Sequence, residues 1–539
     1  MTSPAHSSAP AREIEEFERL KPRLTHLWNA LTARGEEAYT SVVVPSMTLD
    51  SRELMKLEGA SFYEERLLFL LIRLRNPQAR MVYVTSQPVH PLILEYYLQL
   101  LAGIPASHAQ ARLSLFCVQD DSPRPLTEKI LERPRLIERI RRSIPDPDRA
   151  FLTVFSSSPL ERRLAVLLGI PLNGVDPRLH HLGTKSGSRK VFRNAGINLP
   201  MGFEDLRSRS DLLEALAALK RERPGARRAV VKLEDSFSGE GNAIYEFPQE
   251  LSLTALDAAL ERLRLAVPEE TPVSFLEKFE RMGGIVEEFL EEGEVRSPSA
   301  QLRIDPQGDP VLLSTHDQIL GGPTGQVYLG CRFPADDAYR ARIQPEAMRI
   351  GHVLAREGVV SRFGIDFLAR RLPGGIDWET CALEINLRMG GTTHPFLALQ
   401  FLTGGALDLG TGLFHSARGL PKYYASTDNL KSERYRGLCP EDLIDIMTAH
   451  RLHYDPATES GVLFHMIGGL SRYGKVGLTA FGNSHSEVDT TYGRAVAALD
   501  SETVGPSEDS PSAKRQSSVS DPSRRRKDRP ASDADARVH

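Results

Sequence analysis

Two short stretches late in the chain, Gly364–Ala369 and Leu383–Arg388, place the strongest constraint on the fold. In both, apolar and polar side chains alternate, which is the pattern of a β-strand with one buried face. A Pro-Gly-Gly turn signal lies between them, so we expect two neighbouring antiparallel strands. One strand then carries Asp366. The other carries Glu384 and Asn386 on a single face, because residues two apart in a strand share a face.

The three polar side chains of this hairpin indicate a metal site. Two carboxylates and an amide oxygen that converge on one face repel one another unless a cation lies between them. Oxygen ligands of this kind suit Mg²⁺, which keeps water molecules and takes substrate phosphate oxygens to complete its shell. The alternative is a hairpin that turns a polar face to solvent. The E-x-N-x-R string that begins at Glu384, next to the strand of Asp366, favours the metal site.

Length and composition bound the class of protein. A chain of 539 residues is too long for one core, so two or three domains are expected. The net charge, 67 − 71 = −4, gives no electrostatic basis for binding nucleic acid or an anionic membrane. The four cysteines contain no C-x-x-C pair, and no signal-peptide core or membrane-length apolar run occurs. We therefore expect a cytoplasmic protein in a reducing compartment, without nucleic-acid or membrane partners.

The first third of the chain, after a lead of residues 1–12, alternates strand-like and helix-like patterns. Strand patterns occur at Ser41–Val44, Met81–Val84, Leu113–Val118 and Phe151–Phe155. This rhythm predicts a doubly wound parallel α/β domain over residues 13–180. No G-x-G-x-x-G follows the first strand, so nothing supports a dinucleotide site there. At the other end, residues 501–539 have almost no apolar content, and we expect a disordered tail.

A lysine inside an apolar strand marks a second candidate site. Lys232 lies in the strand pattern Ala229–Leu233, and a loop rich in serine and glycine leads to the next strand at Ala243–Phe247. Burying a lysine is costly unless an anion meets it. Glycine lets the backbone approach a ligand closely, so that successive N–H groups can bind an anion. The alternative is a plain hairpin whose lysine reaches solvent.

A third candidate is the acidic stretch Gly284–Glu294, which has the pattern of a strand that ends in a connecting segment. Exposed backbone with acidic side chains there would bind an amino-heterocycle and a ribose. The alternative is a solvated acidic loop.

Together, these three stretches resemble the ATP-grasp carboxylate–amine ligases over residues 190–400. The resemblance rests on the strand lysine with its Gly/Ser loop, the V-E-E-F-L…E segment and the D…E-x-N-x-R strand pair. Over residues 40–500 the chain is also similar to the peptide ligases of the pheganomycin type. The stretches that carry this likeness are Gly183–Lys190, Glu384–Pro395 and Gly461–Lys475.

The resemblance implies the order of the domains. An ATP-grasp domain at 181–415 would follow the α/β pre-ATP-grasp domain. It would have a nucleotide-binding lobe at 190–290 and a metal and substrate lobe at 291–415. A small C-terminal ligase-associated α/β domain would occupy 420–500, before the tail.

The resemblance also implies which residues bind ATP. The phosphates would meet Lys232 and Lys190, with Lys185 as the alternative to Lys190. The loop that closes over the triphosphate would contain Ser238, Gly239 and Gly241. The adenine would meet Glu287 and the main chain of Glu288 and Leu290, and the ribose hydroxyls would meet Glu294.

Mg²⁺, with Mn²⁺ as an alternative, would bind Asp366, Glu384 and Asn386, and Arg388 would face the developing phosphate charge. Some ligases of the superfamily place an arginine two positions before the aspartate, where this chain has Gly364. The candidates to replace that arginine are Arg303, Arg332 and Arg362.

The implied activity is the joining of a small-molecule carboxylate to the amine of an amino acid or peptide. ATP would phosphorylate the carboxylate, and the amine would displace phosphate, so that ADP and phosphate are released. Two alternatives remain: a nucleotide-binding regulator with the same fold, and an ATP-grasp enzyme of different chemistry. The sequence identifies neither substrate, and it leaves a homo-oligomer open.

Overall fold

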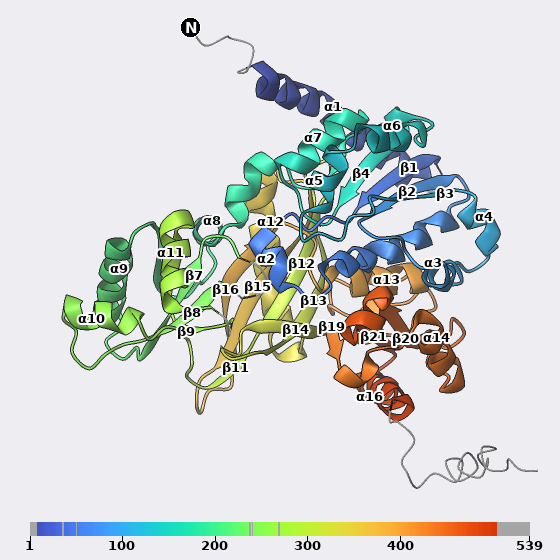
Figure 1. Cartoon of the computed structure of the whole chain (residues 1–539). Coiled ribbons are helices and arrows are strands. Elements are labelled where there is room, and N and C mark those ends of the chain that lie inside the picture. The colour runs from blue at the N-terminus through green and yellow to red at the C-terminus, as the bar shows by residue number, and fades with distance from the viewer. Residues whose placement is uncertain are drawn as a thin grey trace, which may run out of the picture.

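The protein is described from a computed structural model that covers residues 8–34, 37–49, 51–236, 239, 241–267 and 270–503. Within these ranges the strands form sheets of five, five and nine strands and a two-stranded ribbon. Figure 1 shows the second sheet, with its helices, projecting on one side of the large sheet, and the N-terminal and C-terminal parts packed on the other. No described helix combines the length and the apolar character needed to cross a membrane.

The first sheet is wholly parallel over the described residues, with strand order β3-β2-β1-β4-β5. Its strands are β1 (Tyr39–Val44), β2 (Ala79–Thr85), β3 (Leu113–Cys117), β4 (Ala150–Val154) and β5 (Leu172–Asn173). Neighbouring residues of β1 point to opposite faces: Val43 packs in the core with η1 and α3, whereas Val42 packs in the core with α5, α6 and α7. Helices therefore cover both faces, which confirms the predicted doubly wound α/β part.

The helices of this part differ more from the prediction than the strands do. They are α1 (Ser8–Arg34), α2 (Ser51–Lys56), η1 (Ala60–Arg75), α3 (Pro91–Leu98), α4 (Ala106–Gln110), α5 (Leu126–Leu131), α6 (Pro134–Arg142), η2 (Pro147–Arg149), α7 (Pro159–Leu168) and η3 (Pro177–Gly183). The predicted lead of residues 1–12 overlaps α1, which already begins at Ser8. Buried Phe17 packs in the core of the α/β part and holds that helix on it.

The second sheet is antiparallel, and among the described residues its order is β6-β10-β7-β8-β9. Its strands are β6 (Gly202–Leu206), β7 (Arg228–Leu233), β8 (Asn242–Glu246), β9 (Arg264–Leu265) and β10 (Gly284–Glu288). The helices around it are α8 (Lys185–Asn194), α9 (Arg209–Glu222), α10 (Leu253–Leu260) and α11 (Pro272–Met282). Apolar residues of α9, α10 and α11 pack on one face of this sheet and form a separate core with it.

The third sheet is built from strands that lie between residues 294 and 482. Its strands are β11 (Glu294–Arg296), β12 (Pro298–Ile304), β13 (Pro310–Gly321), β14 (Val327–Phe333), β15 (Ser361–Arg371), β16 (Glu379–Asn386), β19 (Tyr423–Lys431), β20 (Gly461–His465) and β21 (Lys475–Gly482). The order is β11-β15-β12-β13-β14-β19-β21-β20, with β16 paired to β15. Cys331 of β14 pairs with Ser426 of β19, so the strands of the C-terminal unit continue the sheet of the preceding lobe.

Further helices lie between and after these strands in the chain. They are α12 (Asp337–Arg356), α13 (Thr393–Thr403), η4 (Glu433–Tyr435), α14 (Pro440–Ala449), η5 (Ile467–Gly469), α15 (Leu470–Tyr473) and α16 (His485–Glu502). A ribbon of β17 (Ala406–Leu407) and β18 (Phe414–His415) follows α13. The predicted tail starts at residue 501, but α16 continues to Glu502; residues 504–539 lie outside the described residues.

One apolar core joins the N-terminal part to the C-terminal strands, and η1 lies at its centre. Leu67–Ile72 of η1 share this core with residues of β19, β20 and β21. Glu65 of η1 accepts a hydrogen bond from the backbone N–H of Gly468 at 3.0 Å. Burial, with a smaller contribution from the neighbouring Glu64, raises the pKa of Glu65 to about 7. A buried acid therefore lies in the contact between the two ends of the described chain.

Candidate active site

The acidic hairpin forms as the sequence predicts. β15 and β16 pair antiparallel, with Asp366 opposite Glu384 and Gly364 opposite Asn386. Directly opposed residues of an antiparallel pair share a face, so Asp366, Glu384 and Asn386 lie together. All three line a cavity of about 650 Å³, a volume within the usual range for small-molecule sites.

The contacts of Asp366 show how these groups are oriented. Nδ2 of Asn386 donates to Oδ2 of Asp366 at 3.0 Å, and Nε2 of Gln318 donates to Oδ1 at 2.6 Å. Nη2 of Arg388 donates to Oδ1 of Asn386 at 3.0 Å. Burial, followed by the charge of Glu384, raises the pKa of Asp366 above its ordinary value. A proton or a cation is therefore favoured between the two carboxylates, and their oxygens fit a hard divalent ion such as Mg²⁺. Asn386 would have to turn its amide to offer an oxygen ligand, because here its Nδ2 faces Asp366.

A lysine from a distant helix also reaches the hairpin. Nζ of Lys185 lies 2.7 Å from Oε1 of Glu384, and the lysine side chain is buried. It is the first residue of α8, which begins there because the side chain of Thr184 caps it by accepting the N–H of Gly187 at 3.1 Å. The lysine predicted in first place, Lys190, is half exposed, pairs with Asp205 and does not line the cavity. Neither lysine is among the residues that line the cavity, but Lys185, given as the alternative in the prediction, is the one that contacts the hairpin.

Lys232, predicted to meet phosphate, is buried in the cavity wall and has an acidic partner. Its Nζ lies 2.5 Å from Oε2 of Glu287, and the exposed fractions of these two residues are 7% and 2%. The guanidinium of Arg189 binds the other carboxylate oxygen of Glu287. Burial works to raise the pKa of Glu287, but the two cations outweigh it and hold that pKa below its ordinary value. Two residues expected to bind different parts of ATP therefore bind each other here.

The glycine-rich loop after β7 lies against the loop between β13 and β14. Gly239 has a φ of 80°, and a Cβ there would lie 2.4 Å from the carbonyl oxygen of Gln326. Nδ2 of Asn242 donates to Oε1 of Gln326 at 2.8 Å. Gly239 and Asn242 line the cavity, as does Gln326, so these two loops form part of its wall. A Cβ at Gly241 would lie 2.3 Å from Cβ of Ser236, and Ser238 lies outside the described residues.

The acidic stretch that begins in β10 was predicted to line the nucleotide site, and only part of it lines the cavity. Glu288 and Leu290 line the cavity, with Glu288 paired to Arg223 at 3.2 Å. Glu294, predicted for the ribose, does not line it. It pairs with Arg296 and Arg371 on the other face of β11, whereas its neighbour Val295 lines the cavity. The alternation of side chains along a strand thus turns Glu294 outward.

The three arginines predicted as catalytic lie in different places. Arg388 lines the cavity beside the carboxylates. Arg303 does not: its guanidinium stacks 4.5 Å from the ring centroid of Trp28, where α1 covers the far end of β12. Arg332 pairs with Asp489 of α16 at 2.8 Å. The structure therefore does not bring Arg303 or Arg332 to the cavity, whereas it does bring Arg388 there.

A wall of the cavity that the sequence did not predict comes from the two ends of the chain. Its lining residues from α2, η1 and their connection are Lys56, Leu57, Glu58, Tyr63 and Arg66, and those from the C-terminal unit are Asp428, Asn429, Lys431 and Lys475. Nη1 of Arg66 lies 3.1 Å from Oδ2 of Asp428, and Nζ of Lys475 donates to the hydroxyl of Tyr63 at 2.6 Å. Lys431 pairs with Glu58. Of these lining residues, only Lys475 stands in a stretch that carries the family resemblance, and that was the one signal in the sequence for this wall.

The two antiparallel sheets, with a buried lysine on one and paired carboxylates on the other, define an ATP-grasp protein. A family model described as "IQCH-like, ATP-grasp" matches residues 177–272 and 270–410. A second model, "PGM1 C-terminal domain", matches residues 442–495. The biotin carboxylase of Campylobacter jejuni, solved with an ATP analogue, aligns with a TM-score of 0.51 and 11% identity, covering 88% of this chain and 96% of that one. It supports the fold alone.

A curated relative shows which family the chain belongs to. The chain is 32% identical over 467 residues to the L-propargylglycine–L-glutamate ligase of Streptantibioticus cattleyicolor, covering 85% of this chain and 94% of the relative. It is also 23% identical to the IQ motif-containing protein H of Danio rerio, over 74% of this chain but only 42% of that protein. The chain belongs to the ATP-grasp ligase family that includes the Streptantibioticus enzyme, which confirms the predicted superfamily.

Proposed function

We propose that the protein is an ATP- and Mg²⁺-dependent ligase that joins the carboxylate of one amino acid to the amine of another amino acid or of a peptide. The observation that carries this proposal is the cavity between the two antiparallel sheets. It has Asp366, Glu384 and Asn386 on one wall and Lys232 on the other. The predicted domain division at 13–180, 181–415 and 420–500 is part of the proposal.

In this proposal the nucleotide lies between the two sheets. Lys232 donates to the phosphates and keeps its contact with Glu287, since an ammonium group has three donors. Lys185 and Arg388, both next to the carboxylate hairpin, supply positive charge near the γ-phosphate. Glu288 and Leu290 line the adenine end. When bound, Mg²⁺ offsets the charge of the phosphate oxygens.

The reaction has two steps, and the protein acts mainly by positioning. A carboxylate oxygen of the first substrate attacks the γ-phosphorus, and the bond from that phosphorus to ADP breaks. The amine of the second substrate then attacks the acyl carbon, phosphate leaves with the former carboxylate oxygen, and the amine loses a proton. Arg388 meets the charge that develops on the transferred group. The contact of Gly239 and Asn242 with Gln326 would keep out water, which would otherwise hydrolyse the acyl phosphate.

The charge of the remaining wall supports an acidic substrate. The Streptantibioticus relative is named for joining L-propargylglycine to L-glutamate. In this chain, Arg66, Lys431 and Lys475 face the same cavity. Each is a multiple donor and can bind a substrate carboxylate while it keeps its protein partner. We infer that one of the two amino acids carries an extra carboxylate.

The test is phosphate release from ATP with pairs of amino acids, using the full chain and millimolar Mg²⁺. We expect release to require two amino acids, to be greatest when one of them is glutamate or aspartate, and to yield ADP with a dipeptide. AMP formed in step with product would refute the phosphoryl-transfer route. Nucleotide binding without turnover on any pair of amino acids or short peptides would favour a regulator with the same fold.

A further inference from the structure

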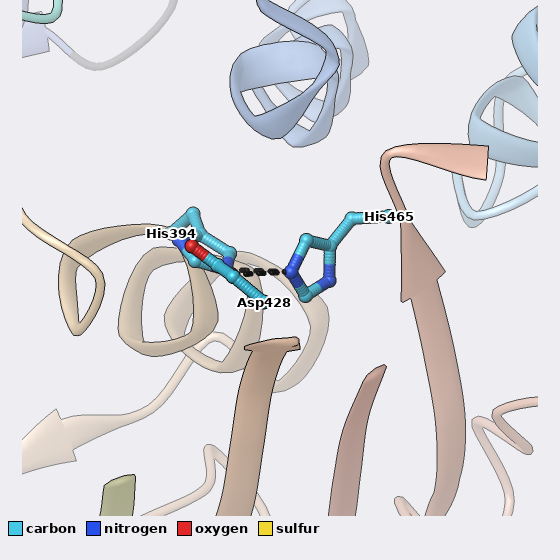
Figure 2. Close-up of side chains that lie close together, drawn as sticks. All are labelled: His394, Asp428 and His465. Carbon is cyan, nitrogen blue, oxygen red and sulfur yellow. Dashed lines mark hydrogen bonds and ion pairs between the residues drawn. The ribbon is translucent and has the colours of Figure 1, made fainter. Parts of the chain in front are cut away.

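Two histidines and an aspartate converge beside the active-site cavity, although they are far apart in the sequence. His394 comes from the first turn of α13, Asp428 from β19 and His465 from the end of β20. Figure 2 shows the three side chains pointing toward one another from these elements. Nε2 of His465 lies 2.7 Å from Oδ1 of Asp428, Nε2 of His394 lies 3.2 Å from the same oxygen, and the two Nε2 atoms are 3.0 Å apart.

The cluster is buried, and its surroundings hold it in place. His394, Asp428 and His465 are 5%, 5% and 3% exposed. Nη1 of Arg66 lies 3.1 Å from Oδ2 of Asp428, which leaves Oδ1 for the histidines. A Cβ at Gly477 would lie 2.0 Å from Nε2 of His465, so a glycine at this position of β21 is what leaves room for the ring. Within the described part of the chain, this is the only group of three or more His, Cys, Asp or Glu whose ligand atoms come this close together.

Hydrogen bonds alone do not satisfy all three contacts. If one Nε2 carries a proton and donates it to the other Nε2, the hydrogen bond satisfies the contact between the two rings. The lone pair of the donor's partner nitrogen then lies close to the carboxylate oxygen, which repels it. Two protons, each donated to Oδ1, place two N–H dipoles side by side at 3.0 Å. A cation at the centre attracts all three lone pairs at once, and buried charged or polar groups are stable only when they are satisfied in this way.

The geometry points to a divalent metal. We propose that His394, Asp428 and His465 bind one ion of the Zn²⁺ class, in a site distinct from the oxygen site of Asp366 and Glu384. Imidazole and carboxylate are the ligands such ions prefer, at about 2.0–2.2 Å. Tetrahedral bonds of that length separate ligand atoms by about 3.3–3.6 Å. The observed separations of 2.7, 3.0 and 3.2 Å would therefore open by about 0.1–0.9 Å when an ion binds.

The site is three-coordinate from the protein, which leaves a position for water or another ligand. Asp428 lines the active-site cavity, as does Thr393, the neighbour of His394. An ion here would therefore lie at the cavity wall, close to the surface assigned to the acidic substrate. Nδ1 of His394 is buried and has no hydrogen-bond partner among the described residues. Since such a partner adds about 10- to 100-fold to affinity, we expect weaker binding than at a fully supported histidine site.

The test uses the untagged full chain, stripped of metal with a chelator and returned to millimolar Mg²⁺, which occupies the hard oxygen site but binds imidazole poorly. Co²⁺ and Zn²⁺ are added without nucleotide, so the outcome does not depend on the ligase proposal. We expect one ion per chain to remain after desalting, with visible absorption of four- or five-coordinate Co²⁺. We also expect hyperfine-shifted ring N–H signals from two histidines.

Substitutions decide which residues hold the ion. His465→Gln and Asp428→Asn should each weaken Co²⁺ binding by more than about 100-fold, because each removes a ligand rather than the partner of a ligand. His453→Gln, on an exposed histidine, and Glu384→Gln, in the oxygen site, should leave it unchanged. Binding that survives His465→Gln, or wild-type protein that retains no ion, overturns the proposal. If the ligand variants do not fold, the number of shifted histidine signals in the wild type decides instead.

Discussion

Replacing Lys232 by methionine tests the nucleotide site and the stability of the lobe together. The substitution keeps the length of the side chain but removes the cation that lies 2.5 Å from Glu287. Removing one partner of a buried ion pair costs about 3–5 kcal/mol, because the other charge is left uncompensated. Arg189 still binds Glu287, so we expect the lower end of that range, about 3 kcal/mol.

The effect on nucleotide binding is separate and measurable. A lost charge-assisted contact to phosphate costs about 1.5–3 kcal/mol, or roughly 10- to 150-fold in affinity. The assays are urea unfolding and calorimetric titration with a non-hydrolysable ATP analogue and Mg²⁺. Glu287→Gln and the double variant complete a cycle. We expect the double variant to lose less stability than the two single variants together, by about 1–3 kcal/mol, since the residues are in contact.

The two measurements can refute different parts of the reasoning. Unchanged affinity in a folded but less stable Lys232→Met protein would mean that this lysine is only the counterion of Glu287. Unchanged stability would mean that the pair does not stabilise the lobe.

Three further predictions concern the metal hairpin, the phosphate lysine and the buried acid. Glu384→Gln and Asp366→Asn should each abolish turnover in a Mg²⁺ titration, with non-additive losses, because they belong to one site; near-wild-type turnover by either would make the hairpin a scaffold. Lys185→Met should lower turnover strongly and Lys190→Met hardly at all. If Lys190→Met lowered turnover more than Lys185→Met, Lys190 would be the phosphate lysine, as predicted first from the sequence. Burial raises the pKa of Glu65 from 4.5 to about 7 in the folded protein, so the fold favours the protonated acid. The free energy of unfolding should therefore fall as the pH rises from 4.5 through 7, because the unfolded chain releases this proton first. Glu65→Gln should therefore stabilise the protein by up to about 3 kcal/mol above pH 8 and by little at pH 4; a pH-independent difference in urea unfolding would contradict this.

The sequence predicted features that depend on local pattern. The pairing of Asp366 with Glu384 follows from two alternating strands and a turn, all within some twenty residues. The choice between Lys185 and Lys190 required the start of α8, since a helix places residues five apart on different faces. The cap at Thr184 is the local signal that fixes that start.

Contacts between distant segments could not be predicted from one sequence. Arg303 lies on the same strand as cavity-lining residues, and only the packing of α1 over the end of β12 shows that it is out of reach. Arg66 and Asp428 meet across 362 residues. His394 and His465 stand in stretches that carry the family resemblance, yet nothing local indicates that their rings face each other. Such pairs are set by how η1, α13 and α1 pack against the strands of the third sheet.

The pairing of β14 with β19 limits how substrate specificity could be transferred from one relative to another. Because β14 is hydrogen-bonded to β19, the C-terminal unit shares one sheet with the preceding lobe and is not a separate cassette that could be exchanged between relatives. A chimera joined near residue 420 would have to rebuild a sheet seam, the apolar core around η1 and part of the cavity wall together. Substrate preference in this family should therefore change by point substitutions around Arg66 and Lys431, or by transfer of nearly the whole chain, rather than by swapping its last hundred residues.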